Sequence, residues 1–299
     1  MDIAERKTIH RVDLTPLGRP HGLWFAGGKL YFTAEANMAI GRYDPASNKV
    51  DWILGTGQDR THMIVVTKDE KTIFTSNVTS DTISIIERGG PGGPGGPPGG
   101  PGGGPPGGGF GGPPPDGPPP SGPPPDGPGG PPPGGGAGGP PPMGGPGGPE
   151  WRQTLVKVGR GPEGFDVSPD GKELWTAHMQ DGRVSVIDLA AKKVIHTIDV
   201  GARGANRLKF TPDGKLALVS EIAGGDLIVL DVDTRSVTKR IKLGRGASGI
   251  LVPPDGTRAF VAMTGENTVA VVDLKTLDVT ARLKTGRGPD GMAWLEGNR

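Results

Sequence analysis

The 299-residue chain contains no cysteine. This absence excludes disulfide bonds, thiolate metal ligands, a cysteine nucleophile and covalently attached c-type haem. Long apolar runs are also missing, since none reaches the roughly 18 residues that a membrane-spanning helix needs. The opening residues MDIAERKTIHRVDL are charged and lack the apolar segment of a signal peptide. A formal net charge of +1 gives no indication of nucleic-acid binding.

Several catalytic motifs are absent as well. The sequence has no G-x-S-x-G nucleophile elbow, no H-E-x-x-H zinc motif, no phosphate-binding loop and no dinucleotide fingerprint. These absences remove the commonest motif-bearing hydrolases, nucleotide-binding proteins and dehydrogenases. Any activity must therefore come from side chains that the fold brings together.

What the sequence does contain is a repeat. The glycines Gly159, Gly201, Gly244 and Gly286 lie 42, 43 and 42 residues apart, and similar segments follow each of them. One unit reads as four short strands, which we expect at residues 165–167, 173–177, 183–188 and 193–198 and call a, b, c and d, from the channel outwards. The intervening Ser-Pro-Asp-Gly at residues 168–171 is typical of a type I turn. Four strands per unit of about 40 residues predict the blades of a β-propeller.

The repeat resembles the YVTN family of β-propeller repeat proteins. The resemblance is carried by the SPDG turn, the V-S-V-I-D strand, and the signature slots at residues 74–77 (FTSN) and 175–178 (WTAH). It covers the whole chain except a Pro/Gly-rich tract. Residues 18–50 are also similar to repeats of streptogramin B lyase and, more loosely, of gluconolactonase-type propellers. The resemblance implies a propeller, and propellers host many activities.

The repeat starts predict how many blades the propeller has. They fall at Gly18, Gly57, Gly159, Gly201, Gly244 and Gly286. We expect an all-β propeller with six blade positions, of which five are complete. The sixth would be split between the termini, with strand d at residues 7–14 and strand a at residues 292–294. Its missing strands suggest an N-terminally truncated chain, whose longer parent could have seven blades and a secretion signal.

A single insertion interrupts the repeats. Residues 89–149 are almost entirely glycine and proline, and the chain holds 56 glycines and 34 prolines in total. A segment with so few apolar side chains cannot offset the entropy of ordering, so we expect disorder with polyproline character. The tract falls in the loop between strands c and d of the second blade. We therefore predict one propeller domain over residues 1–299.

Two sequence columns should meet at one mouth of the central channel. The first is the residue at the start of each strand a, and the second is the last residue of each strand b. Polar residue types vary within the first column, whereas the neighbouring Pro and Gly positions repeat. A site built from several blades would show this pattern, although a water-filled mouth also tolerates polar residues. The columns are His21, His62, Glu163, Asn206, Ser248 and Asp290, and Glu35, Asn77, His178, Glu221 and Met263.

A third column is basic and follows the loops from strand d to strand a. A ring of arginines would attract anions to the mouth. The alternative is that each arginine pairs with a carboxylate of a neighbouring blade. The members are Arg19, Arg160, Arg203, Arg245 and Arg287.

Two functions remain open. The first is a non-enzymatic, monomeric propeller, periplasmic or secreted, that binds a small anionic ligand or a partner protein at the mouth. The second is implied by the resemblance to streptogramin B lyase and gluconolactonases: a metal-dependent lyase or lactonase. A divalent ion such as calcium or magnesium would then be the cofactor, with His21, His62 or His178 as base. Carboxylates for the metal would come from Glu35, Glu163 or Glu221. Three or more such atoms converging would favour the second function, and a dispersed ring the first.

Overall fold

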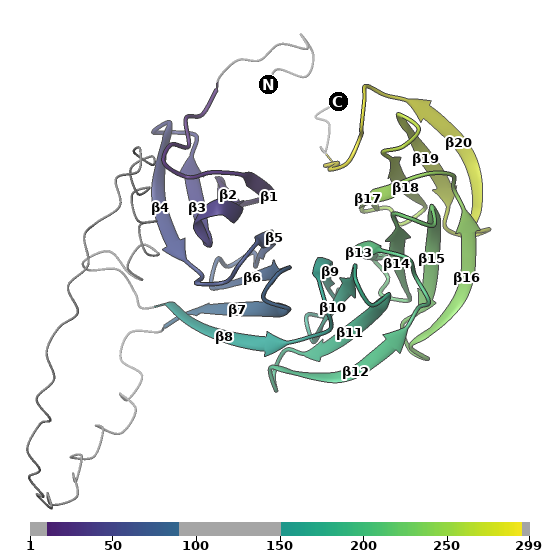
Figure 1. The fold of residues 1–299 in the computed structure, drawn as a ribbon, viewed down its shortest axis with the longest axis horizontal. Coiled ribbons are helices and arrows are strands. Elements are labelled where there is room, and N and C mark those ends of the chain that lie inside the picture. The colour runs from purple at the N-terminus through teal and green to yellow at the C-terminus, as the bar shows by residue number, and fades with distance from the viewer. Residues whose placement is uncertain (1–10, 90–150, 295–299) are drawn as a thin grey trace, which may run out of the picture. The chain divides into compact units, whose positions relative to one another are not determined.

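The computed structural model describes residues 11–89 and 151–294, which belong to one compact unit. It consists of five antiparallel sheets of four strands, each sheet running in chain order from the channel outwards (Figure 1). Blade 1 contains β1 (Pro20–Ala26), β2 (Lys29–Ala34), β3 (Ala39–Asp44) and β4 (Lys49–Gly55), with the short 3-10 helix η1 (Glu35–Asn37) after β2. Blade 2 contains β5 (Thr61–Val66), β6 (Thr72–Asn77), β7 (Thr82–Arg88) and β8 (Trp151–Lys157).

The remaining three blades repeat the same pattern. Blade 3 contains β9 (Pro162–Val167), β10 (Glu173–His178), β11 (Arg183–Asp188) and β12 (Lys193–Asp199). Blade 4 contains β13 (Ala205–Phe210), β14 (Leu216–Glu221), β15 (Asp226–Asp231) and β16 (Ser236–Lys242). Blade 5 contains β17 (Ala247–Leu251), β18 (Arg258–Met263), β19 (Thr268–Asp273) and β20 (Asp278–Lys284). The predicted strands and the turn at Ser168–Gly171 are present, with Gly171 N donating to Ser168 O at 2.8 Å.

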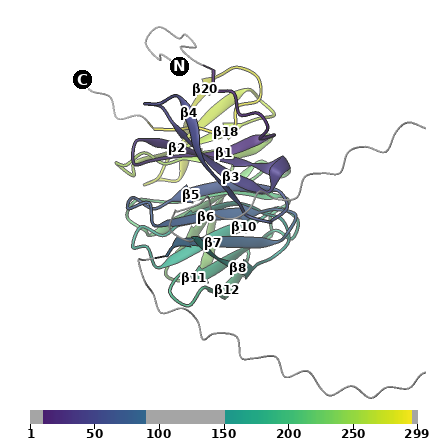
Figure 2. The ribbon, with the colours of Figure 1, turned by 90° about the vertical axis from the view of Figure 1, so that its left-hand side faces the viewer.

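Apolar side chains between neighbouring blades form the core. Between blades 3 and 4, the fully buried Trp175 packs edge-on against Phe210, their ring centroids 5.4 Å apart. Middle strands are buried on both faces, whereas the outermost strands, such as β12, expose most of their residues. The core thus lies in the seams between blades, and Figure 2 shows the sheets from the side. No helix in the described part of the chain is long and apolar enough to cross a membrane.

The structure has five blades, and the prediction of six or seven is wrong. Residues 11–14 and 285–294 form no strand, while residues 1–10 lie outside the described range. The physical reason is that a lone inner segment has no strands b and c to exchange backbone hydrogen bonds with. The segment at residues 286–294 lies against blade 5 without pairing. Its Asp290 main chain approaches Gly249 so closely that a Cβ on that glycine would be 1.9 Å from the carbonyl oxygen.

The predicted Pro/Gly tract lies outside the described residues except for Gly89. The strands on either side of it pair directly, in antiparallel register from Thr82 opposite Lys157 to Arg88 opposite Trp151. The residues that flank the tract, Arg88 and Trp151, therefore lie side by side at one end of the β7–β8 hairpin.

Candidate functional site

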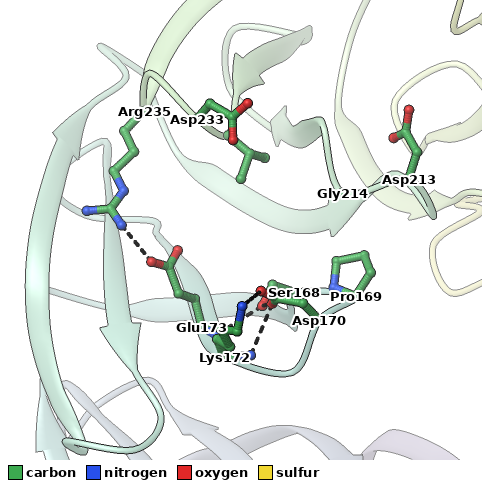
Figure 3. A pocket seen from close by; sticks show the side chains of 10 residues that line it. Ser168, Pro169, Asp170, Lys172, Glu173, Asp213, Gly214, Asp233 and Arg235 are labelled. Carbon is green, nitrogen blue, oxygen red and sulfur yellow. Dashed lines mark hydrogen bonds and ion pairs between the residues drawn. The ribbon is translucent and has the colours of Figure 1, made fainter.

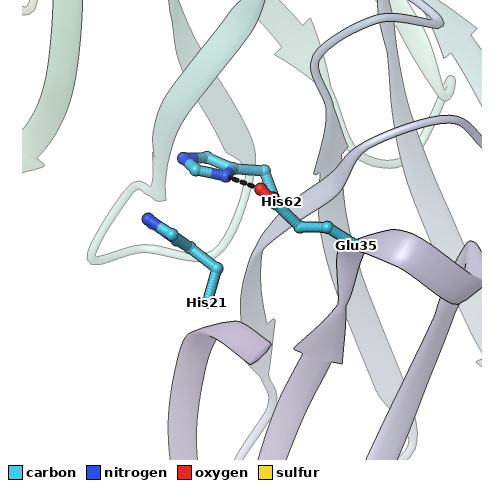
Figure 4. A group of neighbouring side chains, drawn as sticks. All are labelled: His21, Glu35 and His62. Atoms are coloured by element: carbon cyan, nitrogen blue, oxygen red, sulfur yellow. Dashed lines mark hydrogen bonds and ion pairs between the residues drawn. The ribbon is translucent and has the colours of Figure 1, made fainter. Parts of the chain in front are cut away.

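Polar side chains from blades 1 to 4 converge at the end of the channel where the inner strands begin. His21 lies on β1 and His62 on β5, and their rings stack with centroids 3.8 Å apart. Glu35 reaches the same place from η1, where it follows β2 (Figure 4). Glu163 joins them from β9. We call His21, Glu35, Arg60, His62, Glu163, Arg207 and Asp290 the mouth cluster.

His62 is held between two carboxylates. Its Nδ1 lies 2.5 Å from Glu35 Oε1, and its Nε2 lies 3.0 Å from Glu163 Oε1. Because a carboxylate accepts hydrogen bonds, Nδ1 carries the hydrogen of the first contact. Nε2 makes no well-directed hydrogen bond, although His62 is only 2% exposed. A neutral imidazole that carries its hydrogen on Nδ1 has none on Nε2. The Nε2 and the Glu163 Oε1 are then two hydrogen-bond acceptors that face each other.

The inner strands place these residues for a steric reason. Gly22 follows His21, and a Cβ there would come within 2.5 Å of the His62 carbonyl oxygen on the next blade. Gly164 approaches Asn206 in the same way, at 2.6 Å. The glycine after the first-column residue thus lets neighbouring inner strands approach closely. As a result, the side chains at the start of these strands can meet.

Burial and charge shift the ionisation of two cluster residues. His21 is exposed at its outer edge, but the partial loss of hydration at the mouth lowers its pKa to about 4, and the nearby His62 and Arg207 act in the same direction. Burial alone would raise the pKa of Glu163. The close contact with His62 and the charges of Arg207 and Arg60 outweigh it and hold that pKa below its usual value. At neutral pH, His21 is therefore uncharged and Glu163 is ionised.

A metal ion suits part of this cluster. One ligand atom each from His21, Glu35 and His62 lie within 4.8 Å of one another. Two imidazoles and one carboxylate form a donor set that borderline divalent metals prefer. The buried Nε2 of His62 has no hydrogen-bond partner among the described residues and lies beside the Glu163 carboxylate, so its lone pair is available to bind the metal. The residues present therefore fit a divalent cation.

The other predicted members of the two columns do not join the cluster. Asn77 bonds within its own blade, to Thr82 and Ser84. His178 is buried against Gly159 and contacts Asp181 at 3.1 Å, and burial lowers its pKa. Glu221 accepts a hydrogen bond from Arg203 N, and the Ser248 hydroxyl bonds that of Thr264. Met263 lies in the core, and Asn206 is buried on β13.

The predicted arginine column occupies the loops at the mouth but leaves most side chains exposed. Arg19 contacts Glu35 at 3.4 Å and Arg203 contacts Glu221 at 4.0 Å, each through a largely exposed side chain. Among the described residues, no ion pair joins Arg160, Arg245 or Arg287 to a carboxylate. Carboxylates instead cap their main chains: Asp181 accepts from Arg160 N and Glu266 from Arg245 N. These loop positions are therefore fixed by backbone hydrogen bonds.

The sequence also places Arg60 beside the predicted arginine ring, in blade 2, whereas Arg207 was not predicted as a site residue. Arg60 Nε lies 3.7 Å from Glu35 Oε1, and its Nη2 lies 3.8 Å from Glu163 Oε1. Arg207 reaches Glu163 at 3.8 Å and Asp290 at 3.5 Å. The signal for Arg207 was available: it occupies the slot where other repeats carry Gly22, Gly164, Gly249 and Gly291.

A second hollow lies on the opposite face, between blades 3 and 4 (Figure 3). Most of its charged side chains already have partners among the described residues. Glu173 pairs with Arg235 at 2.6 Å, and Asp170 with Lys172 at 3.2 Å. Asp213 accepts a hydrogen bond from Thr211 Oγ1 at 2.6 Å within its turn. These carboxylates stabilise turns and strand ends, so the mouth cluster is the better candidate site.

No protein-family model and no curated protein matches the chain. Solved structures do match. Streptogramin B lyase superposes with a TM-score of 0.64 at 12% identity, over 94% of this chain and 75% of that one. A protein of unknown function from Desulfotomaculum acetoxidans DSM 771 gives 0.62 at 12% identity, over 89% and 68%. Hydrazine synthase of Kuenenia stuttgartiensis gives 0.54 at 14% identity, over 95% and 92%. At such low identity the likeness concerns the fold alone: the chain is a β-propeller similar in fold to streptogramin B lyase.

Proposed function

We propose that the protein binds a divalent cation at the channel mouth and acts there as a metal-dependent lyase or lactonase. The observation that supports this most directly is the convergence of ligand atoms from His21, Glu35 and His62 within 4.8 Å. The fold similarity to a structure named as a lyase is in keeping with it. With two imidazoles in the donor set, manganese or zinc fits better than calcium or magnesium, which favour all-oxygen sites.

The chain's own residues supply the remaining chemistry. Both reactions need a proton acceptor and stabilisation of negative charge on an oxygen. A bound divalent cation would supply that stabilisation as a Lewis acid. His21, whose pKa is lowered to about 4, is uncharged at neutral pH, so a ring nitrogen can bind the cation. Glu163, which lies outside this donor set and is ionised, would then be the proton acceptor. Glu35 orients His62 through the Nδ1 hydrogen bond, as outer carboxylates do for metal-binding histidines.

Manganese binding tests the proposal directly. The full-length protein, freed of metal with a chelator, should bind Mn²⁺ at one site, detected by the loss of the free-ion electron paramagnetic resonance signal. His62→Ala and His21→Ala should each weaken binding by at least about tenfold, since each removes one ligand. His196→Ala is the matched control, because His196 lies exposed on the outer strand β12. Equal Mn²⁺ affinity in all four proteins would rule the site out.

Turnover is tested separately with the Mn²⁺-loaded protein. A panel of simple lactones, and of esters that can eliminate across a carbon–oxygen bond, should reveal hydrolysis or alkene formation that chelation abolishes. Metal binding without turnover of any panel member would leave a binding protein rather than an enzyme.

Binding alone is the second candidate, and one observation favours it. The side chains of Arg160, Arg203, Arg245 and Arg287 remain exposed around the mouth, where they would attract a small anionic ligand or an acidic partner. Replacing Arg160 and Arg245 with alanine should then weaken ligand binding and reduce its salt dependence. A periplasmic or secreted location belongs to the same proposal, and fractionation of cells expressing the full-length protein would test it.

A further inference from the structure

Two guanidinium groups lie among the carboxylates of the mouth cluster. Arg60 precedes β5 and spans the gap between Glu35 and Glu163, at 3.7 and 3.8 Å. Arg207, on β13, spans Glu163 and Asp290, at 3.8 and 3.5 Å. Only 12% of the Arg207 side chain is exposed. Four different blades and the segment after β20 therefore converge on one polar centre.

These contacts leave hydrogen-bonding capacity unused. N–H···O hydrogen bonds in proteins span roughly 2.7–3.2 Å, so contacts of 3.5–3.8 Å are ion pairs without hydrogen bonds. Arg60 Nε and Arg207 Nη1 are buried, and neither has a hydrogen-bond partner within residues 11–89 and 151–294. A buried donor without a partner is costly, because its hydration is lost and not replaced. A ligand oxygen that came within hydrogen-bonding distance of both donors would restore both bonds.

The charges of the cluster limit which ligand can bind. With His62 uncharged, as a metal ligand must be, Glu35, Glu163 and Asp290 carry three negative charges, whereas Arg60 and Arg207 carry two positive ones. Arg19 is 73% exposed, so solvent screens most of its charge. The excess is one negative charge, which disfavours an anion. Binding of the divalent cation would turn this into an excess of one positive charge, which a monoanion neutralises.

We propose that the cation-loaded mouth cluster binds a carboxylate through Arg60 and Arg207, and hence that the substrate carries a carboxylate group. This inference rests on the proposed metal site. It assigns Arg60 and Arg207 as substrate-binding residues, in place of the exposed arginine ring. The planar, forked guanidinium matches a carboxylate better than a lysine ammonium does. Carboxylate and cation should consequently bind cooperatively.

Acetate and its neutral isostere acetamide are the probes for this cooperativity. The full-length wild-type protein is titrated with Mn²⁺ in the presence and absence of acetate, followed by electron paramagnetic resonance. Acetate should tighten Mn²⁺ binding by about fivefold or more, a usual size for coupled sites. By linkage, Mn²⁺ should tighten acetate binding, measured by calorimetry, by the same factor. Acetamide should change Mn²⁺ affinity by less than about twofold, since it brings no charge.

Variants separate the arginines from the metal itself. Arg207→Gln should bind Mn²⁺ at least as tightly as the wild type but lose the effect of acetate. Arg207→Lys should retain part of it, because the charge stays and the fork is lost. Arg160→Gln, at an exposed mouth arginine outside the cluster, should behave as wild type. Melting temperatures of all variants confirm that they are folded.

The outcomes distinguish the two proposals. Failure of wild-type protein to bind Mn²⁺ removes the proposed metal site, and the coupled carboxylate site with it. If Mn²⁺ binds but acetate and acetamide act alike, only the carboxylate site is wrong. The same holds if Arg207→Gln keeps the full acetate effect, because acetate then binds the metal alone. An equal loss in Arg160→Gln would point to the outer arginines instead.

Discussion

At the scale of single residues, His21 gives the chain a measurable response to pH. Its pKa in the folded protein is about 4, below the ordinary 6.5, so the unfolded chain binds its proton more readily. Stability from this group is complete above pH 6.5 and falls as the pH drops towards 4. In the metal-free protein, His21→Gln should therefore lose less stability than the wild type between pH 6.5 and 4. Urea unfolding across this range measures the difference.

A second histidine substitution controls for the acidic groups that titrate in the same range. His196→Gln, on the exposed β12, should follow the wild-type curve. If His21→Gln runs parallel to the wild type as well, His21 is not held in its uncharged form. A direct titration of the His21 ring by nuclear magnetic resonance gives the same answer independently, with a midpoint near 4 expected.

At the scale of elements, the second and third strands of blade 1 can pack together only because one position on the third strand is a glycine. Phe32 on β2 lies opposite Gly41 on β3, and a Cβ on that glycine would be 2.3 Å from the ring. Gly41→Ala should destabilise the protein by about 1–3 kcal/mol, because the buried Phe32 has little room to move. Phe32→Leu in the same chain should recover part of that loss. A double-mutant cycle of unfolding free energies measures the coupling, and strictly additive effects would contradict the contact.

At the scale of the whole molecule, the five-bladed unit should fold without the Pro/Gly tract. Arg88 and Trp151 are directly paired across β7 and β8, so a short turn can replace residues 90–150. The shortened chain should keep its melting temperature within about 5 °C, the shift that roughly 1–2 kcal/mol produces in a domain of this size. Differential scanning calorimetry of both chains decides the matter. A larger drop would mean that the tract contributes to the stability of the blades.

The sequence predicted the blades well and the site only in part. Glycine spacing and turn chemistry indicated four-stranded units because both act locally. The predicted number of blades was wrong because it assumed that the two end segments pair as strands. Such pairing needs neighbouring strands b and c, which similarity of the end segments to the repeat does not provide. His21, His62 and Glu163 meet as their shared column predicted. Of the second column, Glu35 joins them, whereas Asn77, His178 and Glu221 have hydrogen-bond partners within their own blades and loops.

The direct pairing of Arg88 with Trp151 has a practical consequence for handling the protein. In this alternating strand order, the β7–β8 hairpin closes on the face opposite to the mouth cluster. A cargo domain, an affinity tag or a surface-attachment peptide inserted between these two strands would be attached to the face opposite to the mouth cluster. Sensors or immobilised reactors built in this way would present the channel mouth to solution, whichever ligand enters it.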